Sequence, residues 1–175
     1  MNSTESSTKG CDLTIYLTSY NESMMIEGAM LRILEALSDF NYTYEIIIID
    51  DCSQDDSASV INKFILKHRL EDRIRLIENK INLGIGVNYY HAAEMGRGEY
   101  FIAFFGDNPV PLESMKAVLG LLGKADMVLP YLNTKLFFMK DNCDHRSFGR
   151  RLISVIYSRI VRLLSGKKIA YFNGF

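Results

Sequence analysis

The amino-acid sequence predicts an α/β protein with a mostly parallel central sheet between layers of helices, and two observations lead to this prediction. Apolar, β-rich segments alternate almost without exception with segments whose apolar residues recur at helical spacing. In addition, the segment from Glu45 to Ile49 contains four consecutive isoleucines, which is typical of a strand buried on both faces. Regular alternation of strands and helices favours parallel pairing, because each helix carries the chain back to the start of the next strand.

The individual elements follow from the same patterns. Strands are expected at residues 12–18, 45–49, 73–78, 99–105 and 126–129. The apolar face expected for the first helix comprises Met25, Ala29, Ile33, Ala36 and Leu37. The second helix is expected to begin near Asp55 or Asp56, because acidic residues favour a helix N-terminus, and to carry on one side Val60, Ile61, Phe64 and Ile65. The third helix is expected from the turn at 82–86 to about Met95, and the fourth at 112–122.

Composition and charge exclude several classes of protein. The formal net charge of -1 argues against a general nucleic-acid-binding surface, so no nucleic-acid partner is expected. Cys11, Cys52 and Cys143 are too few and too scattered for a disulfide framework or a zinc site, and free thiols point to a reducing cytosol. The sequence contains no apolar stretch long enough to span a bilayer. We therefore expect a cytoplasmic protein in which residues 1–11 form a disordered arm and residues 12–175 form the folded domain.

Polar clusters follow three of the expected strands: Tyr20, Asn21 and Glu22 after the first, Asp50 and Asp51 after the second, and Asp107 and Asn108 after the fourth. Because ligands bind beyond the carboxyl ends of the strands in such sheets, the three clusters are expected to converge on one rim. Carboxylates this close repel one another unless a cation or hydrogen-bond donors lie among them. A divalent metal shared with a phosphate substrate is one explanation, and recognition of a nucleobase N–H is another. The alternative is that such residues are ordinary loop and helix-cap residues, an interpretation favoured for Ser53, Asp55 and Asp56.

Other common nucleotide-binding and catalytic motifs do not occur in the sequence. Gly84 and Gly86 precede an expected helix, but the third glycine of the dinucleotide fingerprint is missing. Neither a P-loop lysine nor a G-x-S-x-G elbow is present, and the three histidines show no metal-ligand spacing. The converging carboxylates are therefore the main candidate site.

Three blocks of sequence, taken in order, resemble the donor domain of family 2 glycosyltransferases, which have the GT-A fold, a three-layer sandwich. The blocks are LTSYNES at 17–23, IIIIDDCSQDDS at 46–57 and NLGIGVNYYHAAEMGRGEYFIAFFGDN at 82–108. Within the family, the resemblance is to enzymes that glycosylate polyprenyl phosphates, such as dolichol-phosphate mannose synthase. It implies inverting transfer of a sugar from a nucleoside-diphosphate sugar to an acceptor, for which a polyprenyl phosphate is a candidate.

The resemblance also implies roles for individual residues. Thr18, Tyr20 and Glu22 would line the nucleoside pocket, Asp50 or Asp51 would meet the base, and Asn82 and Gly84 would border the donor. Asp107 matches the final acid of the D-x-D motif. It would be the residue on which catalysis depends, and it would ligate the Mg²⁺ or Mn²⁺ that bridges the diphosphate, with Asn108 as a second, neutral oxygen ligand.

One position departs from the family pattern. Phe105 replaces the first acid of the D-x-D motif, so that the sequence reads F-G-D-N, and an apolar ring has no oxygen with which to reach the ribose or the metal. The chain also ends at Phe175, before the acceptor-side sequence that the family carries, and we expect a truncated domain. Both features leave a second interpretation open, a catalytically impaired module that still binds nucleotide sugars. A nucleotidyltransferase is a third class, but the sequence offers no glycine-rich basic loop near the N-terminus to hold a triphosphate.

Residues 148–164 form a basic amphipathic segment that is expected to be helical. Its apolar residues are Leu152, Val155, Ile156, Ile160, Val161, Leu163 and Leu164, and the basic residues in and around it are Arg146, Arg150, Arg151, Arg159, Arg162, Lys167 and Lys168. Such a helix lies at an anionic membrane surface or packs on the core with its basic face in water, and both interpretations stay open. The spacing of Arg151 and Ser154 resembles the acceptor-side helix of the polyprenyl-phosphate enzymes. This likeness implies that Arg150 or Arg151 meets a lipid phosphate at the inner face of the membrane.

Overall fold

The computed structural model describes residues 10–107 and 110–128 and, further along the chain, residues 153, 156–157, 159–161 and 163–164. The chain divides into two compact units, Met1–Asp126 and Met127–Phe175. The fold described below is that of the first unit, which contains most of the described residues.

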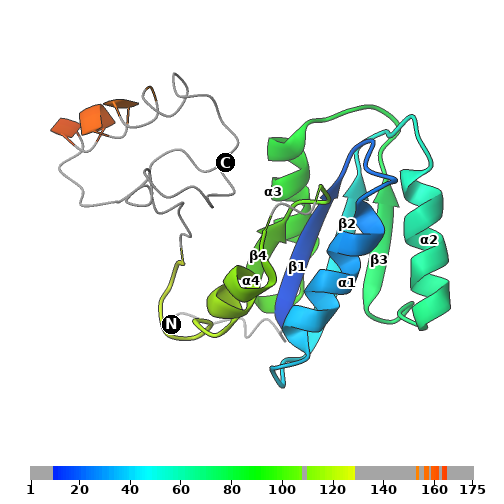
Figure 1. The fold of residues 1–175 in the computed structure, drawn as a ribbon, viewed down its shortest axis with the longest axis horizontal. Coiled ribbons are helices and arrows are strands. Elements are labelled where there is room, and N and C mark those ends of the chain that lie inside the picture. The colour runs from blue at the N-terminus through cyan, green and yellow to red at the C-terminus, as the bar shows by residue number, and fades with distance from the viewer. Residues whose placement is uncertain are drawn as a thin grey trace, which may run out of the picture. The chain divides into compact units, whose positions relative to one another are not determined.

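Strands and helices alternate throughout this unit, as the sequence predicts (Figure 1). The strands are β1 (Cys11–Ser19), β2 (Tyr44–Asp50), β3 (Ile74–Glu78) and β4 (Gly98–Phe104). The helices are α1 (Ile26–Leu37), α2 (Ser57–His68), α3 (Ile85–Met95) and α4 (Leu112–Leu119). Each of these elements overlaps the range expected from the sequence, and the first helix, α1, lies between β1 and β2.

The four strands form one parallel sheet in the order β3-β2-β1-β4. The chain therefore moves outward from β1 through β2 to β3, and then crosses back by way of α3 to place β4 on the other side of β1. In parallel sheets such a reversal is the usual place for a ligand site, beyond the carboxyl ends of the two strands between which the direction changes, here β1 and β4. The register sets Ser19 opposite Asp50 and Leu17 opposite Phe104, so the residues that follow the three strands emerge at the same edge.

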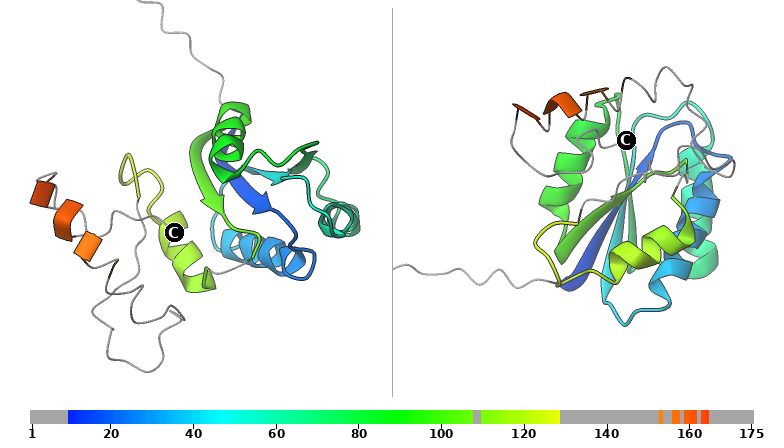
Figure 2. Two further views of the ribbon diagram at one scale, coloured as in Figure 1. Left: turned by 90° about the horizontal axis from the view of Figure 1, so that it is seen from above. Right: turned by 60° about the vertical axis from the view of Figure 1, so that its left-hand side comes forward.

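Helices cover both faces of the sheet, which confirms the expected three-layer sandwich. Helices α1, α2 and α4 lie over one face and α3 lies over the other (Figure 2). The isoleucines of β2 show why the sequence selects this arrangement. Side chains alternate between the faces of a strand, so Ile46 and Ile48 pack in the larger core while Ile47 and Ile49 pack beneath α3.

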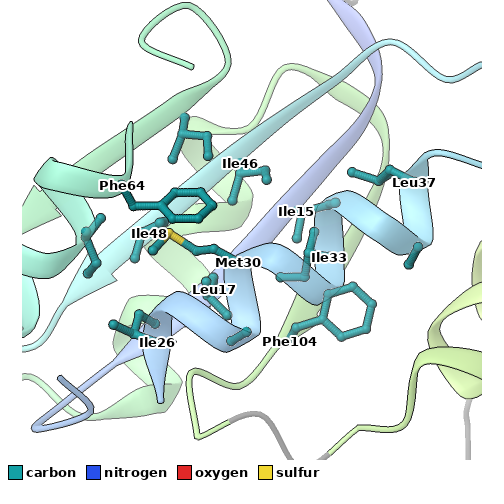
Figure 3. Packing of buried hydrophobic residues seen from close by; sticks show 14 of the residues in the cluster. Ile15, Leu17, Ile26, Met30, Ile33, Leu37, Ile46, Ile48, Phe64 and Phe104 are labelled. Carbon is teal, nitrogen blue, oxygen red and sulfur yellow. The ribbon is translucent and has the colours of Figure 1, made fainter. Parts of the chain in front are cut away.

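The larger core fixes α1 against β1 and β2. In this core Met30 and Ile33 of α1 pack with Leu17, Ile48 and the ring of Phe64 from α2 (Figure 3). All of these side chains are at most 2% exposed. Because α1 begins at the carboxyl end of β1, this packing also fixes where the loop between β1 and α1 can lie.

The opposite end of the sheet is held by a buried carboxylate. Glu45, at the start of β2, accepts a hydrogen bond of 2.8 Å from the Thr14 hydroxyl of β1 and forms an ion pair of 2.9 Å with Arg97, which precedes β4. The Glu45 carboxylate thus joins β2, β1 and the start of β4 at the amino ends of the strands. The polar loops described below follow the opposite, carboxyl ends.

Two details differ from the sequence prediction. Met25 was assigned to the buried face of the first helix, but it lies just before α1 and its side chain is 51% exposed. Ile26 takes the inward position instead, because it shares one helical face with Met30 and Ile33. The short strand expected at 126–129 is also wrong for residues 126–128, which are not in a strand, and Leu129 lies outside the described residues.

Helix α2 ends at a residue with left-handed backbone. Arg69 follows His68 with φ of 55°, a conformation that costs a residue with a side chain more than it costs glycine. We expect Arg69→Gly to stabilise the fold by about 0.5–1 kcal/mol, measured by urea unfolding. Lys63→Gly in the exposed interior of the same helix is the matched control and should destabilise the fold by about 1 kcal/mol. Equal effects of the two substitutions would contradict this account of the helix end.

Candidate functional site

The loops that follow β1 and β4 contact each other directly at the reversal point of the sheet. The backbone N–H of Gly106, which follows β4, donates a hydrogen bond of 3.2 Å to the Thr18 hydroxyl of β1. A Cβ atom at Gly106 would overlap the Thr18 carbonyl oxygen and the Glu22 carboxylate. Only glycine therefore allows the end of β4 to approach the β1 loop this closely.

Glu22 lies beneath this contact with one oxygen unpaired. Its Oε2 atom is buried and has no hydrogen-bond partner among the described residues. Burial and the nearby charge of Asp107, with smaller contributions from Asp50 and Asp55, raise the pKa of Glu22 to about 7 against an opposing hydrogen bond from the Tyr20 backbone. A buried acceptor without a donor is costly, so this carboxylate is suited to meet a donor or a cation supplied by a ligand.

Asp107 follows Gly106 and is exposed at the rim. Its charge acts on Glu22, so the acids that follow β1 and β4 do come together. The second expected metal ligand, Asn108, lies outside the described residues. Across residues 10–107, 110–128 and the described helical positions, no group of three His, Cys, Asp or Glu residues is arranged to hold a metal ion. A single open carboxylate nevertheless fits Mg²⁺ or Mn²⁺ held largely by substrate phosphates and water, the usual arrangement for Mg²⁺.

Asp50 is turned inward and is only 4% exposed. Its Oδ1 atom accepts hydrogen bonds from the hydroxyls of Ser19 (2.8 Å) and Ser53 (2.6 Å), and its Oδ2 atom accepts one from the Ser53 N–H (3.0 Å). Asp50 therefore ties the end of β1 to the first turn after β2.

Asp51 is 6% exposed and holds a different loop. Its oxygens accept hydrogen bonds of 2.8 Å each from the Asn79 side chain and from the N–H groups of Leu83 and Gly84. Burial by itself would raise the pKa of Asp51, but hydrogen bonds from Asn88, Leu83, Asn79 and Gly84 outweigh it and lower the pKa. The geometry separates two acids that the sequence leaves equivalent, because Asp50 faces the β1 loop and Asp51 faces the loop before α3.

The remaining expected site residues divide into two groups. Tyr20 and Asn82 are exposed, while Thr18 and Gly84 are partly exposed. Gly84 immediately precedes α3 and has φ of 81°. Arg150 and Arg151 lie outside the described residues. Phe105 is partly exposed between β4 and Gly106, at the position where the family pattern has the first acid of the D-x-D motif.

Sequence reasoning missed the side chains that join the loops. Ser19, Ser53 and Asn79 anchor the two buried acids, and Asn88, which is 2% exposed, lies beside Asp51 and accepts a bond from Asn79. The available signal was the density of Ser, Asp and Asn after each strand, in which Ser53 was interpreted as an ordinary loop or helix-cap residue. Ser, Asp and Asn residues can cap a local turn or join two loops, and only their hydrogen-bond partners show which role each residue has.

The described positions between Ile153 and Leu164 are helical and carry exposed apolar side chains. The exposed residues are Ile153, Ile156, Tyr157, Ile160, Leu163 and Leu164. At helical spacing these positions fall on one face. Among the described residues we find no helix with the length and apolar character needed to cross a membrane.

Comparison with known sequences identifies the family. The family described as glycosyl transferase family 2 matches residues 14–165, which include both loops at the β1–β4 reversal. The chain belongs to this family. The resemblance inferred from the three sequence blocks is thereby confirmed.

Relatives to which this chain is similar include two dolichyl-phosphate beta-glucosyltransferases. The protein of Dictyostelium discoideum is 27% identical over 119 residues, which cover 65% of this chain and 36% of the relative. The protein of Mus musculus is 32% identical over 166 residues, which cover 90% of this chain and 51% of the relative. The chain thus spans about half or less of the length of these relatives.

A solved structure supports the fold. The chain is similar to the mannosyltransferase PcManGT from Pyrobaculum calidifontis in complex with GDP-Man and Mn²⁺, with a TM-score of 0.50 and 22% sequence identity. The similarity covers 64% of this chain and 32% of that protein. The GT-A fold expected from the sequence is confirmed.

The raised pKa of Glu22 has a consequence for stability. The folded chain keeps the Glu22 proton up to about pH 7, whereas the unfolded chain releases it near pH 4.5. The free energy of unfolding should therefore fall as the pH rises through this window, by about 1–2 kcal/mol after allowance for solvent screening.

We expect Glu22→Gln to remove this part of the pH dependence, when unfolding is followed from pH 4.5 to 8 in the presence of EDTA. Glu35→Gln on the exposed side of α1 is the control and should keep the wild-type slope. If Glu22→Gln and the wild type show parallel curves, the Glu22 carboxylate is not destabilised in the folded state.

Proposed function

We propose that this chain binds a nucleoside-diphosphate sugar in the crevice between the carboxyl ends of β1 and β4 and forms the donor side of an inverting glycosyltransferase. The observation that carries the proposal is the contact at Gly106. Gly106 lies against the Glu22 carboxylate, whose Oε2 atom has no partner among the described residues, and the exposed Asp107 follows it directly, in a chain of glycosyl transferase family 2.

The chain's own residues have separate tasks in this proposal. Asp107 ligates the divalent ion, Mg²⁺ or Mn²⁺, with Asn108 as a second oxygen. When bound, the ion stabilises the negative charge that gathers on the departing diphosphate. Thr18, Tyr20 and Glu22 line the nucleoside pocket. Asp50, whose oxygens accept hydrogen bonds from Ser19 and Ser53, holds the end of β1 beside this pocket. Asp51 holds the loop that contains Asn82 and Gly84, which borders the donor.

The acceptor proposed is a polyprenyl phosphate. The dolichyl-phosphate beta-glucosyltransferases among the relatives support this class of acceptor. A phosphate is already charged at neutral pH, so the reaction needs no general base to activate it. It needs cations instead, and Arg150 and Arg151 are proposed to supply them.

Phe105 supports a second candidate, a module that binds the donor without transferring the sugar. An aromatic ring there removes one carboxylate that the family pattern provides. Calorimetry with UDP- and GDP-sugars, each with and without Mn²⁺, separates the candidates when it is combined with a transfer assay. Metal-dependent binding without turnover indicates the module, turnover indicates the enzyme, and preference for a nucleoside triphosphate contradicts both.

Removal of the Asp107 carboxylate tests the metal site. We expect Asp107→Ala to lower the rate of sugar transfer by about 100-fold or more, because the leaving diphosphate loses the ion that stabilises its charge. Transfer from a labelled donor is measured across a Mn²⁺ titration. Asp72→Asn, an exposed acid that precedes β3 at the opposite end of the strands, is the control. An unchanged turnover number in Asp107→Ala would remove this residue from the mechanism.

We propose that the exposed stripe between Ile153 and Leu164 contacts an anionic membrane, because arginines and lysines flank these apolar residues in the sequence. The chain should float with phosphatidylcholine vesicles that contain phosphatidylserine, and much less with vesicles that lack it. Ile160→Asp should abolish flotation, while Leu66→Asp, which changes an exposed apolar residue of α2, should not. Equal flotation with both kinds of vesicle, or none with either, would contradict the proposal.

A further inference from the structure

We propose that Asp55 and Ser57 are positioning residues that hold the β1–α1 loop, and with it the nucleoside pocket, in its binding conformation. This inference rests on the proposed binding of a nucleoside-diphosphate sugar. It assigns a task to Asp55, which the sequence pattern marks only as a loop or helix-cap residue, and to Ser57, to which the sequence pattern assigns none.

Three consecutive backbone N–H groups of the β1–α1 loop donate to side chains of the loop between β2 and α2 and of the first residue of α2. The N–H of Asn21 donates to the Ser53 hydroxyl (2.9 Å), the N–H of Glu22 to the Ser57 hydroxyl (2.9 Å) and the N–H of Ser23 to the Asp55 carboxylate (3.0 Å). In return, the N–H of Gln54 donates to the Asn21 side-chain oxygen at 2.7 Å. The path of the first loop therefore depends on side chains of the second. We call this set of bonds the loop clip.

Asp55 is the centre of the loop clip. Its Oδ1 atom accepts hydrogen bonds from both the N–H and the hydroxyl of Ser57, and its Oδ2 atom accepts from Ser23. Because the Ser57 hydroxyl donates to Asp55, its oxygen lone pairs are directed to the N–H of Glu22. Ser57 is fully buried, which limits the alternatives open to its hydroxyl. An asparagine at position 55 would offer one oxygen and one NH₂ group where two acceptors are needed.

The loop clip acts on residues that line the proposed pocket. Tyr20 and Glu22 lie on either side of Asn21, whose backbone is held with φ of 55°. The Glu22 carboxylate lies so close to Gly106 that a Cβ atom at position 106 would overlap it. A loop that is ordered before the ligand arrives pays less entropy on binding, so release of the loop should weaken donor binding.

The neighbouring acid provides a matched control. Asp56 is also exposed, and it precedes α2 without a side-chain hydrogen bond to the helix. Asp55→Asn and Asp56→Asn therefore make the same chemical change one residue apart, and remove the same charge. Only the first breaks the loop clip.

The first measurement needs no ligand. Amide hydrogen exchange, followed by NMR on the whole chain, reports the N–H groups of Glu22 and Ser23 directly. In Asp55→Asn we expect both amides to exchange about tenfold faster, while Asp56→Asn matches the wild type. Equal exchange in the two variants would overturn the loop clip.

The second measurement concerns the donor. The Kd for the UDP- or GDP-sugar that binds the wild type is measured by calorimetry at a temperature at which all variants are fully folded. We expect Asp55→Asn to raise Kd about five- to tenfold and Asp56→Asn to leave it unchanged. A role confined to stability would lower the melting temperature and leave Kd unchanged, and this outcome would overturn the inference.

A second pair of variants covers the case in which Asp55→Asn does not fold. Ser57→Ala removes the acceptor of the Glu22 N–H but keeps the Asp55 charge, and Ser59→Ala on the exposed side of α2 is its control. Faster exchange at Glu22 and weaker donor binding are expected for the first alone, and equal values in both would overturn the inference. Failure of the wild type to bind any nucleotide sugar would instead refute the proposed function, and the exchange result would still stand.

Discussion

The burial of the central residues of β1 and β2 between two helical layers is the constraint on which the rest of the molecule depends. These central residues are mostly apolar, and the buried polar side chains Thr14 and Glu45 bond to each other, so most other polar groups gather where the strands end. Parallel pairing brings those ends to one edge, and the reversal between β1 and β4 opens that edge. The position of the candidate site thus follows from the packing of isoleucines and leucines far from it.

The acids at this edge are not equivalent. Asp50 and Asp51 are nearly buried, and each has its oxygens occupied by donors from the chain itself. Glu22 keeps one buried oxygen without a donor, and Asp107 faces water. The first two acids therefore organise loops, while the carboxylates of the last two are not neutralised by donors from the chain. A ligand that carries a cation and hydrogen-bond donors would supply the missing partners.

Much of the fold could be predicted because strand and helix periods are strong local signals. The four isoleucines of β2 specify a doubly buried strand, and the apolar positions of α1 specify its inner face. The register of that face was misjudged by one residue at Met25, since only the place where the helix begins decides between Met25 and Ile26. The strand expected at 126–129 was based on a short apolar run, and a run of this length is compatible with a strand, a helix or a loop.

The site was harder to predict because it depends on partners distant in sequence. That acids would meet at one rim followed from topology alone. Topology did not show which donors each carboxylate would have. Asp50 and Asp51 are neighbours in sequence, but their side chains point in different directions and their donors come from separate loops. The hydrogen bonds that the β1–α1 loop donates to Ser53, Asp55 and Ser57 join residues about thirty positions apart in sequence. No local periodicity predicts such pairs.

The close approach at Gly106 bears on how such a protein can diversify. Position 106 is closed to variation, since any side chain there would push apart the two halves of the crevice. Position 105, immediately before it, is partly open to water and escapes this steric limit. A library designed to change sugar or nucleotide preference should hold the glycine constant and vary its neighbour.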